Sequence, residues 1–257
     1  KDKFKSKIII SGGLIAFFYV YSIYLIFPHI INLEIFSILS IFIFIVGIMS
    51  DLKNFSAIVR LILISMISII YLWQTNTYIT DFKFEIINDI FDSNIFIAIL
   101  FTTTCLIILI NGYNFIDGVH GLTILHAILS IILFNYFIFF ILEEQISFDS
   151  ISILLPTLIV LYFQNIRKKI FLGDSGSYYL ASIIGLMIIN QTLNKDYSYP
   201  YVYASILIYP AFEVFFSIFR KIYFKKNPLS PDREHLHHLL KNYLEKEKKI
   251  SFDKASI

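Results

Sequence analysis

Acidic and amide side chains recur at a fixed spacing near the end of one long apolar segment of this sequence. Asn111, Asn114 and Asp117 follow one another at intervals of three residues, so they share one face if the preceding helix continues through them. Ionisable groups at a membrane border are costly to bury unless they are paired or bound to an ion, which makes them candidate functional residues. An ordinary polar helix end is the alternative, although two amides and an acid exceed what capping needs.

A glycine-flanked acid forms the second motif, Phe171-Leu172-Gly173-Asp174-Ser175-Gly176-Ser177. Backbone N–H groups at the start of a helix favour phosphate. Asp174 offers an oxygen ligand to Mg²⁺, which takes few protein carboxylates and completes its shell with phosphates and waters. A Gly/Ser turn that only caps a helix is the competing interpretation. The preceding Arg167, Lys168 and Lys169 suit either phosphate binding or anchoring at a membrane surface.

Three histidines fall within four residues in the third motif, Pro231-Asp232-Arg233-Glu234-His235-Leu236-His237-His238. Their spacing suits a closed zinc site poorly, and no cysteine is nearby. Hydrogen bonding to phosphate or sugar is the expected role, and a solvated basic loop is the alternative. Asp51, at the end of another apolar segment, is a further candidate, with capping of the next helix as its alternative role.

The composition indicates that membrane-spanning helices carry these motifs. Of the 257 residues, 57% are hydrophobic, and the mean hydropathy of +0.74 exceeds what a soluble domain can bury. The apolar runs are continuous rather than alternating, which favours helices over a barrel. We predict an all-α polytopic membrane bundle of about eight transmembrane helices, forming a single domain over residues 1–257. The expected spans are 8–27, 33–49, 57–73, 94–110, 119–142, 150–165, 177–193 and 201–223.

Basic residues gather on one side of this predicted topology. Of the 21 lysines and arginines, only Lys83 and Lys195 fall on the side opposite the three motifs. The positive-inside rule therefore assigns the motifs to the cytoplasmic face of the membrane. The longest outer loop, 74–93, is expected to form a short hairpin or a surface helix. Because the sequence starts at Lys1 rather than Met, we expect it to be part of a longer chain.

Together, the motifs resemble those of the polyprenyl-phosphate N-acetylhexosamine-1-phosphate transferases of glycosyltransferase family 4. The resemblance covers nearly the whole chain in the same order. The pair Asn-x-x-Asn-x-x-Asp-Gly-x-x-Gly-Leu and Phe-Leu-Gly-Asp-x-Gly-Ser is highly specific, and the histidine loop is similar to that of the branch using UDP-N-acetylglucosamine. Ser11-Gly12-Gly13 resembles the glycine pair that opens the family's second helix. The resemblance implies that the family's first and last helices lie outside these residues.

The resemblance implies transfer of a sugar-1-phosphate from a UDP-sugar to undecaprenyl phosphate, with release of UMP, as the start of lipid-linked cell-envelope glycan synthesis. Mg²⁺, or Mn²⁺ in its place, would lie on Asp174 and Asn114 and neutralise the diphosphate. Asp51 and Asp117 would be catalytic, orienting or deprotonating the lipid phosphate. The implied substrate contacts are Asn111, Lys169, Phe171 (by stacking on the uracil), Ser177, Arg233, His235, His237 and His238. Membrane lipid and a homodimer partner are compatible with this reading, and no nucleic acid is expected.

Three positions depart from the family's usual pattern. Ser50 stands where the family usually has the first of two adjacent Asp, and His120 and Glu213 stand where it often has Asp. Loss of the first Asp either shifts the base role to Asp51 and Asp117 or weakens activity, whereas the other two changes would tune nucleotide or sugar choice.

Two other functions are compatible with the sequence. One is a non-catalytic polyprenyl-phosphate-binding or transport protein of the same fold, and the other is a metal-dependent lipid phosphatase. A transporter would be expected to place polar groups near mid-membrane in broken helices. The motifs here lie at helix ends instead, which counts against transport.

Overall fold

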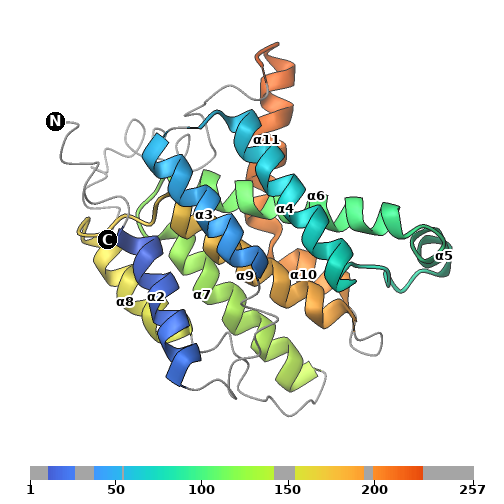
Figure 1. The fold of residues 1–257 in the computed structure, drawn as a ribbon, viewed down its shortest axis with the longest axis horizontal. Helices are drawn as coiled ribbons and strands as arrows, with labels where there is room; N and C mark the ends of the chain where they lie inside the picture. The colour runs from blue at the N-terminus through green and yellow to red at the C-terminus, as the bar shows by residue number, and fades with distance from the viewer. Residues whose placement is uncertain (1–10, 27–37, 54, 142–153, 194–198, 228–257) are drawn as a thin grey trace, which may run out of the picture.

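The computed structural model describes residues 11–26, 38–53, 55–141, 154–193 and 199–227, and within these ranges every regular element is a helix (Figure 1). The helices are α2 (Ser11–Ile26), α3 (Ile38–Lys53), α4 (Ala57–Thr75), α5 (Glu85–Ser93), α6 (Ile95–Ile116), α7 (Leu122–Tyr136) with the π-helical η1 (Phe137–Ile141), α8 (Leu154–Ile166), α9 (Gly173–Leu193), α10 (Pro200–Ile206) and α11 (Ile208–Tyr223). The prediction of an all-α bundle is thus confirmed for the described part of the chain.

Each expected span coincides with a helix or a pair of helices. Not all of these helices are long and apolar enough to cross a membrane. Among the described residues three meet both conditions, namely Ala57–Thr75, Ile95–Ile116 and Leu122–Phe139, and a bent pair would make a fourth. The helices α2, α3 and α8 are shorter, and α9 is more polar. The structure therefore supports a membrane helical protein with three or four spans and leaves the count of eight as a prediction.

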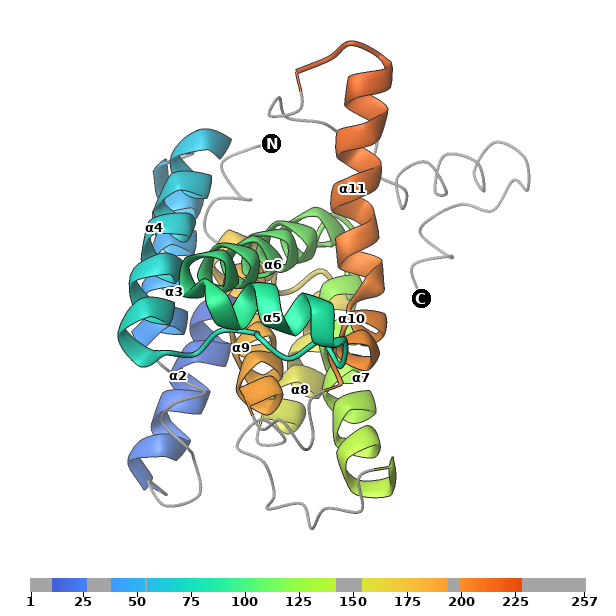
Figure 2. The same ribbon diagram turned by 90° about the vertical axis from the view of Figure 1, so that its right-hand side faces the viewer.

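The expected span over 201–223 consists of two helices rather than one continuous helix, and together they are long and apolar enough to cross a membrane. α10 and α11 meet at a bend of 73° between Ile206 and Ile208. Pro210, in the first turn of α11, has no N–H and its ring would clash with the carbonyl of Ile206 in one continuous helix. The bend sends α11 past the end of its neighbours (Figure 2).

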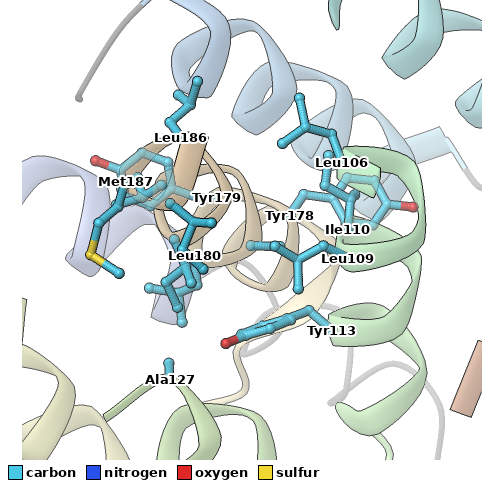
Figure 3. Close-up of a cluster of buried hydrophobic side chains, with 14 of the residues drawn as sticks. Leu106, Leu109, Ile110, Tyr113, Ala127, Tyr178, Tyr179, Leu180, Leu186 and Met187 are labelled. Carbon is cyan, nitrogen blue, oxygen red and sulfur yellow. The ribbon is translucent and has the colours of Figure 1, made fainter. Parts of the chain in front are cut away.

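The centre of the bundle is α9, most of whose length is buried although it is rich in Ser, Gly and Tyr. α3, α6, α2 and α7 pack around it. One apolar cluster joins Tyr178, Leu180 and Met187 of α9 to Leu109 and Tyr113 of α6 (Figure 3). Because a close-packed cluster resists displacement, it fixes the N-terminal half of α9 against the C-terminal half of α6.

The segment that joins α4 to α6 contains a helix rather than a hairpin. α5 occupies Glu85–Ser93, and Asp81 organises the turn before it by accepting hydrogen bonds from the Lys83 backbone N–H (2.9 Å) and the Asn88 side chain (2.9 Å). Of the two expected forms, the helix is confirmed.

Candidate active site

Asp174 is the centre of a polar cluster formed by three other helices. Its Oδ2 accepts hydrogen bonds from the Ser50 hydroxyl (2.6 Å) and the Arg60 guanidinium (2.7 Å), and its Oδ1 accepts one from the Asn114 side chain (2.6 Å). Ser50 comes from α3, Arg60 from α4 and Asn114 from α6. The side chains of Asn114 and Asp174 therefore meet at the point where these helices reach the first turn of α9.

Asp51 binds the N-terminus of α9 through both of its carboxylate oxygens. Oδ1 accepts from the Asp174 backbone N–H (2.9 Å) and Oδ2 from that of Ser175 (3.0 Å). The first N–H groups of a helix have no partner within it, and a negative charge there is favourable. Asp51 thus caps α9 rather than α4, whose own N-cap is Ser56. These two N–H groups of α9 are then occupied by protein and not available to phosphate.

Glycines allow the helices to approach closely enough for these contacts. A Cβ on Gly47 of α3 would lie 2.5 Å from the Ser175 Cα, and one on Gly13 of α2 would lie 2.6 Å from the Gly176 N. Real Cβ atoms do not approach backbone so closely, so only glycine fits at either position. Gly173 itself starts α9 with a φ of 74°, in the left-handed region that favours glycine.

Asp117 follows α6 as its C-cap residue and lies near both other acids. Burial raises its pKa well above the usual value for an aspartate, and the negative charges of Asp174 and Asp51 act in the same direction. Three acidic side chains from α3, the end of α6 and α9 therefore form one electrostatic unit. Such a unit favours binding of a cation or retention of a proton.

Arg60 is the residue that the sequence reasoning missed. The sequence predicts only that Arg60 lies on the basic side of the membrane, yet the residue forms an ion pair with Asp174 and donates to the Ser50 hydroxyl (3.3 Å). The side chains of Arg60 and Asp174 are only 24% and 25% exposed. A signal was present, because Arg60 is the one charged residue in the apolar run of α4, and such residues within spans are functional candidates.

The other predicted site residues have different contacts. Asn111 donates to the Ile107 carbonyl of its own helix (2.8 Å), and the buried Ser177 hydroxyl donates to the Asp174 carbonyl (3.2 Å). Lys169 is exposed in the loop before α9. The predicted contacts Arg233, His235, His237 and His238 lie outside the described residues.

The loops after α6 and before α9 lie beside each other. The rings of His120 and Phe171 have centroids 5.2 Å apart. Asn165, which is buried, accepts from the Gly121 backbone N–H and donates to the Ile170 carbonyl (2.9 Å), so it ties the two loops together. Asn165 was also missed from sequence, since a single Asn at the end of an apolar run resembles an ordinary helix end.

The donor set suits a hard divalent cation better than zinc. It consists of carboxylate and amide oxygens, the ligands that Mg²⁺ takes, and like-charged acids surround Asp174. Among the described residues, no group of three or more His, Cys, Asp and Glu is arranged to hold a metal ion by itself. A Mg²⁺ ion would fit here with one or two protein ligands and the phosphates of a substrate.

Comparison with known proteins gives the same picture. The model of glycosyl transferase family 4 matches residues 33–192. An undecaprenyl-phosphate alpha-N-acetylglucosaminyl 1-phosphate transferase from Thermotoga maritima is 27% identical over 218 residues, covering 84% of this chain and 64% of the relative. The Escherichia coli (strain K12) protein of the same name is 27% identical over 136 residues, covering 51% of this chain and 37% of the relative.

A probable undecaprenyl-phosphate N-acetylglucosaminyl 1-phosphate transferase from Bacillus subtilis is 28% identical over 202 residues, covering 77% of this chain and 55% of the relative. The chain thus spans less than two thirds of the length of each of these three relatives. No solved structure matches it. Since the family model covers more than half of the chain and includes Asp51, Asn114, Asp117 and Asp174, the chain belongs to glycosyl transferase family 4.

Proposed function

We propose that this protein transfers N-acetylhexosamine-1-phosphate from a UDP-sugar to undecaprenyl phosphate and releases UMP. One observation carries the proposal, namely that Asp51, Asn114, Asp117 and Asp174 meet at one end of an apolar helical bundle. A site in that position is open to a soluble nucleotide on one side and to a lipid on the other. The names of the relatives support the classes of donor and acceptor.

The chemistry is a phosphoryl-group substitution. An oxygen of the lipid phosphate attacks the β-phosphorus of the UDP-sugar, the bond from that phosphorus to the bridging oxygen breaks, and UMP leaves with that oxygen. The attacking phosphate is already anionic at neutral pH, so the reaction needs positioning and charge stabilisation more than a strong base. Asp117, with its raised pKa, is suited to take the remaining proton from a monoanionic lipid phosphate.

Asp174 and Asn114 would hold the divalent cation, Mg²⁺ or Mn²⁺. When bound, the ion supplies positive charge that offsets the charge of the diphosphate. Asp51 fixes the first turn of α9, so it sets the direction of the Asp174 side chain toward that ion.

The nucleotide would lie on the loops beside Asp174. His120 and Phe171 offer adjacent rings for the uracil, and the exposed Lys169 offers charge for a phosphate. Asn111 and Ser177 would support the site from α6 and α9. The loop with Arg233, His235, His237 and His238 would complete the contacts to the sugar and the phosphates.

We assign the site to the cytoplasmic face of a bacterial inner membrane. The support is the distribution of lysine and arginine in the sequence. The whole chain would form one transferase domain, and a homodimer is compatible with this arrangement.

The test uses membranes that carry the protein expressed from its full gene, with Mg²⁺, undecaprenyl phosphate and labelled UDP-hexosamines supplied one at a time. Transfer of label to the lipid should match release of UMP. Asp174→Asn should lose at least 100-fold in rate, the order expected for removal of a charge-stabilising group. Lys53→Met, which removes an exposed charge near the same end, is the matched control. Release of free phosphate without label transfer would instead identify a lipid phosphatase.

A further inference from the structure

The Asp174 carboxylate is bound on both oxygens by groups of the protein itself. A carboxylate has about four positions for accepting hydrogen bonds, and Ser50, Arg60 and Asn114 take three of them. One of the three donors carries a full positive charge, so the guanidinium stands where a metal ion would otherwise neutralise Asp174.

Ser50 links the guanidinium to this carboxylate. An Asp at position 50 would instead offer Arg60 a second negative charge. The Ser50 hydroxyl is neutral, and it donates to the same Oδ2 atom that Arg60 binds, while Arg60 donates to Ser50. The triangle of Ser50, Arg60 and Asp174 is therefore closed, with Asp174 as its one anion.

We infer that Arg60 and a divalent cation compete for Asp174. Two positive ions on one carboxylate repel each other strongly in a partly buried site, so the cation binds Asp174 when the Arg60 guanidinium leaves Oδ2. The displaced guanidinium is then free to turn toward a phosphate. Arg60 is a positioning residue in this scheme: it holds the carboxylate in place before substrate and metal arrive. The inference rests on the proposed function, because it takes Asp174 to be the metal ligand.

Competition and a purely structural role of Arg60 predict opposite changes in metal binding when Arg60 is removed. If Arg60 only held the site together, its removal would disorder Asp174 and weaken metal binding. If it competes, its removal frees Oδ2 and tightens binding. A hydrogen bond to a charged group is worth about tenfold to a hundredfold in an equilibrium constant, so tightening in that range is expected.

The experiment measures Mn²⁺ binding to the purified full-length protein by the loss of the electron paramagnetic resonance signal of free Mn²⁺. No lipid or nucleotide is added. The variants are Arg60→Met, Asp174→Asn and, as a control for net charge, Lys53→Met, which removes an exposed lysine at the same end of the bundle. Arg60→Gln, which keeps donors for Ser50 and Asp174 without the charge, replaces Arg60→Met if that variant does not fold.

Tighter Mn²⁺ binding by roughly tenfold or more in Arg60→Met, with little change in Lys53→Met and loss of binding in Asp174→Asn, would support the competition. Unchanged or weaker binding in Arg60→Met, with binding still lost in Asp174→Asn, would overturn it and leave Asp174 as a metal ligand. If Asp174→Asn binds Mn²⁺ as the parent protein does, both the competition and the proposed metal site fail, and the transfer assay then decides whether the proposed reaction survives.

Discussion

The Asp51 side chain acts on two parts of the site. Its carboxylate closes the N-terminus of α9 through the N–H groups of Asp174 and Ser175, and its charge also acts on Asp117. A structural role and the proposed catalytic role therefore fall on one side chain. Loss of activity alone cannot distinguish them, whereas stability can.

Asp51→Ala is expected to lower the free energy of unfolding by about 1–2 kcal/mol, because two N–H groups of α9 lose their acceptor. Ser56→Ala removes the cap of α4, a longer bond of 3.4 Å at an exposed position, and is expected to cost about 0.5 kcal/mol. Unfolding of the two purified variants in detergent, compared with the parent, measures both values. Equal losses in the two variants would show that the Asp51 contacts are not the stronger cap.

Titration of Asp117 should produce the rising part, or limb, of the curve of transfer rate against pH. Because the pKa of Asp117 is raised, its carboxyl group still holds a proton at pH values where an ordinary aspartate is ionised. As the pH rises through this raised pKa, the group loses its proton and can then accept one from the lipid phosphate. The rate should therefore increase with pH over that range, and Asp117→Asn should lack this limb.

The lipid phosphate also titrates, with a second pKa of about 6, so the profile of Asp117→Asn is the necessary reference. A limb that remains in Asp117→Asn belongs to the lipid. If the two profiles have the same shape and differ only in height, Asp117 does not accept the proton.

The sequence could predict the acids and amides of the site but not all of their partners. The sequence predicts Asn114 and Asp174 on the same side of the membrane, because each follows or begins an apolar segment there, and the resemblance to the family adds that they share a metal ion. Arg60 could not be placed, since it is separated from Asp174 by 114 positions and its orientation depends on how α4 packs against α3 and α6. The hydrogen bonds from the backbone N–H groups of α9 to the Asp51 carboxylate could not be predicted for the same reason.

At the scale of elements, the contact of α3 with α9 brings Ser50 and Asp51 to the first turn of α9. Gly47 lies one turn before Ser50, where the two helices come closest. Gly185, in the middle of α9, also faces a neighbour, but a Cβ there would meet side-chain ends, the Leu106 Cδ2 at 2.7 Å and the Leu109 Cδ2 at 3.3 Å. A side-chain terminus can rotate away, whereas backbone cannot.

Gly47→Ala is therefore expected to lower the free energy of unfolding by about 1–3 kcal/mol and to reduce transfer, because α3 must move away from Ser175. Gly185→Ala should change stability by less than about 1 kcal/mol, since the gain in helix propensity offsets a small rearrangement of Leu106. Thermal unfolding and transfer rates of both variants test this. A Gly47→Ala protein as stable and active as the parent would mean that the approach of α3 to α9 is not required.

The bend between α10 and α11 shows that apolarity alone does not predict where a helix ends. Residues 201–223 are apolar enough to form one span, and hydropathy does not register Pro210. The position of the proline does indicate the bend, because a proline is tolerated in the first turn of a helix but breaks the hydrogen-bond ladder in the interior. The fold class and the positions of the other helices follow from apolar runs, whereas this bend follows from one residue.

On the scale of the whole molecule, the C-terminal ends of α3 and α6 and the N-termini of α4 and α9 meet at the site, while α5 belongs to the opposite end of α6. The distribution of lysine and arginine predicts that the site faces the cytoplasm. Lys53 and Asp89 are exposed near these two ends. They are therefore suitable positions for labelling from either side of the membrane.

In a Cys105→Ala background, which removes the one cysteine of this sequence, Asp89→Cys should react with a membrane-impermeant maleimide in intact cells. Lys53→Cys should react only after the membrane is opened. The reason is that the impermeant reagent reaches one face at a time, and the positive-inside rule places the α3 end inside. Labelling of Lys53→Cys in intact cells would put the carboxylates on the outer face, away from the cytoplasmic nucleotide, and would remove a UDP-sugar as the donor.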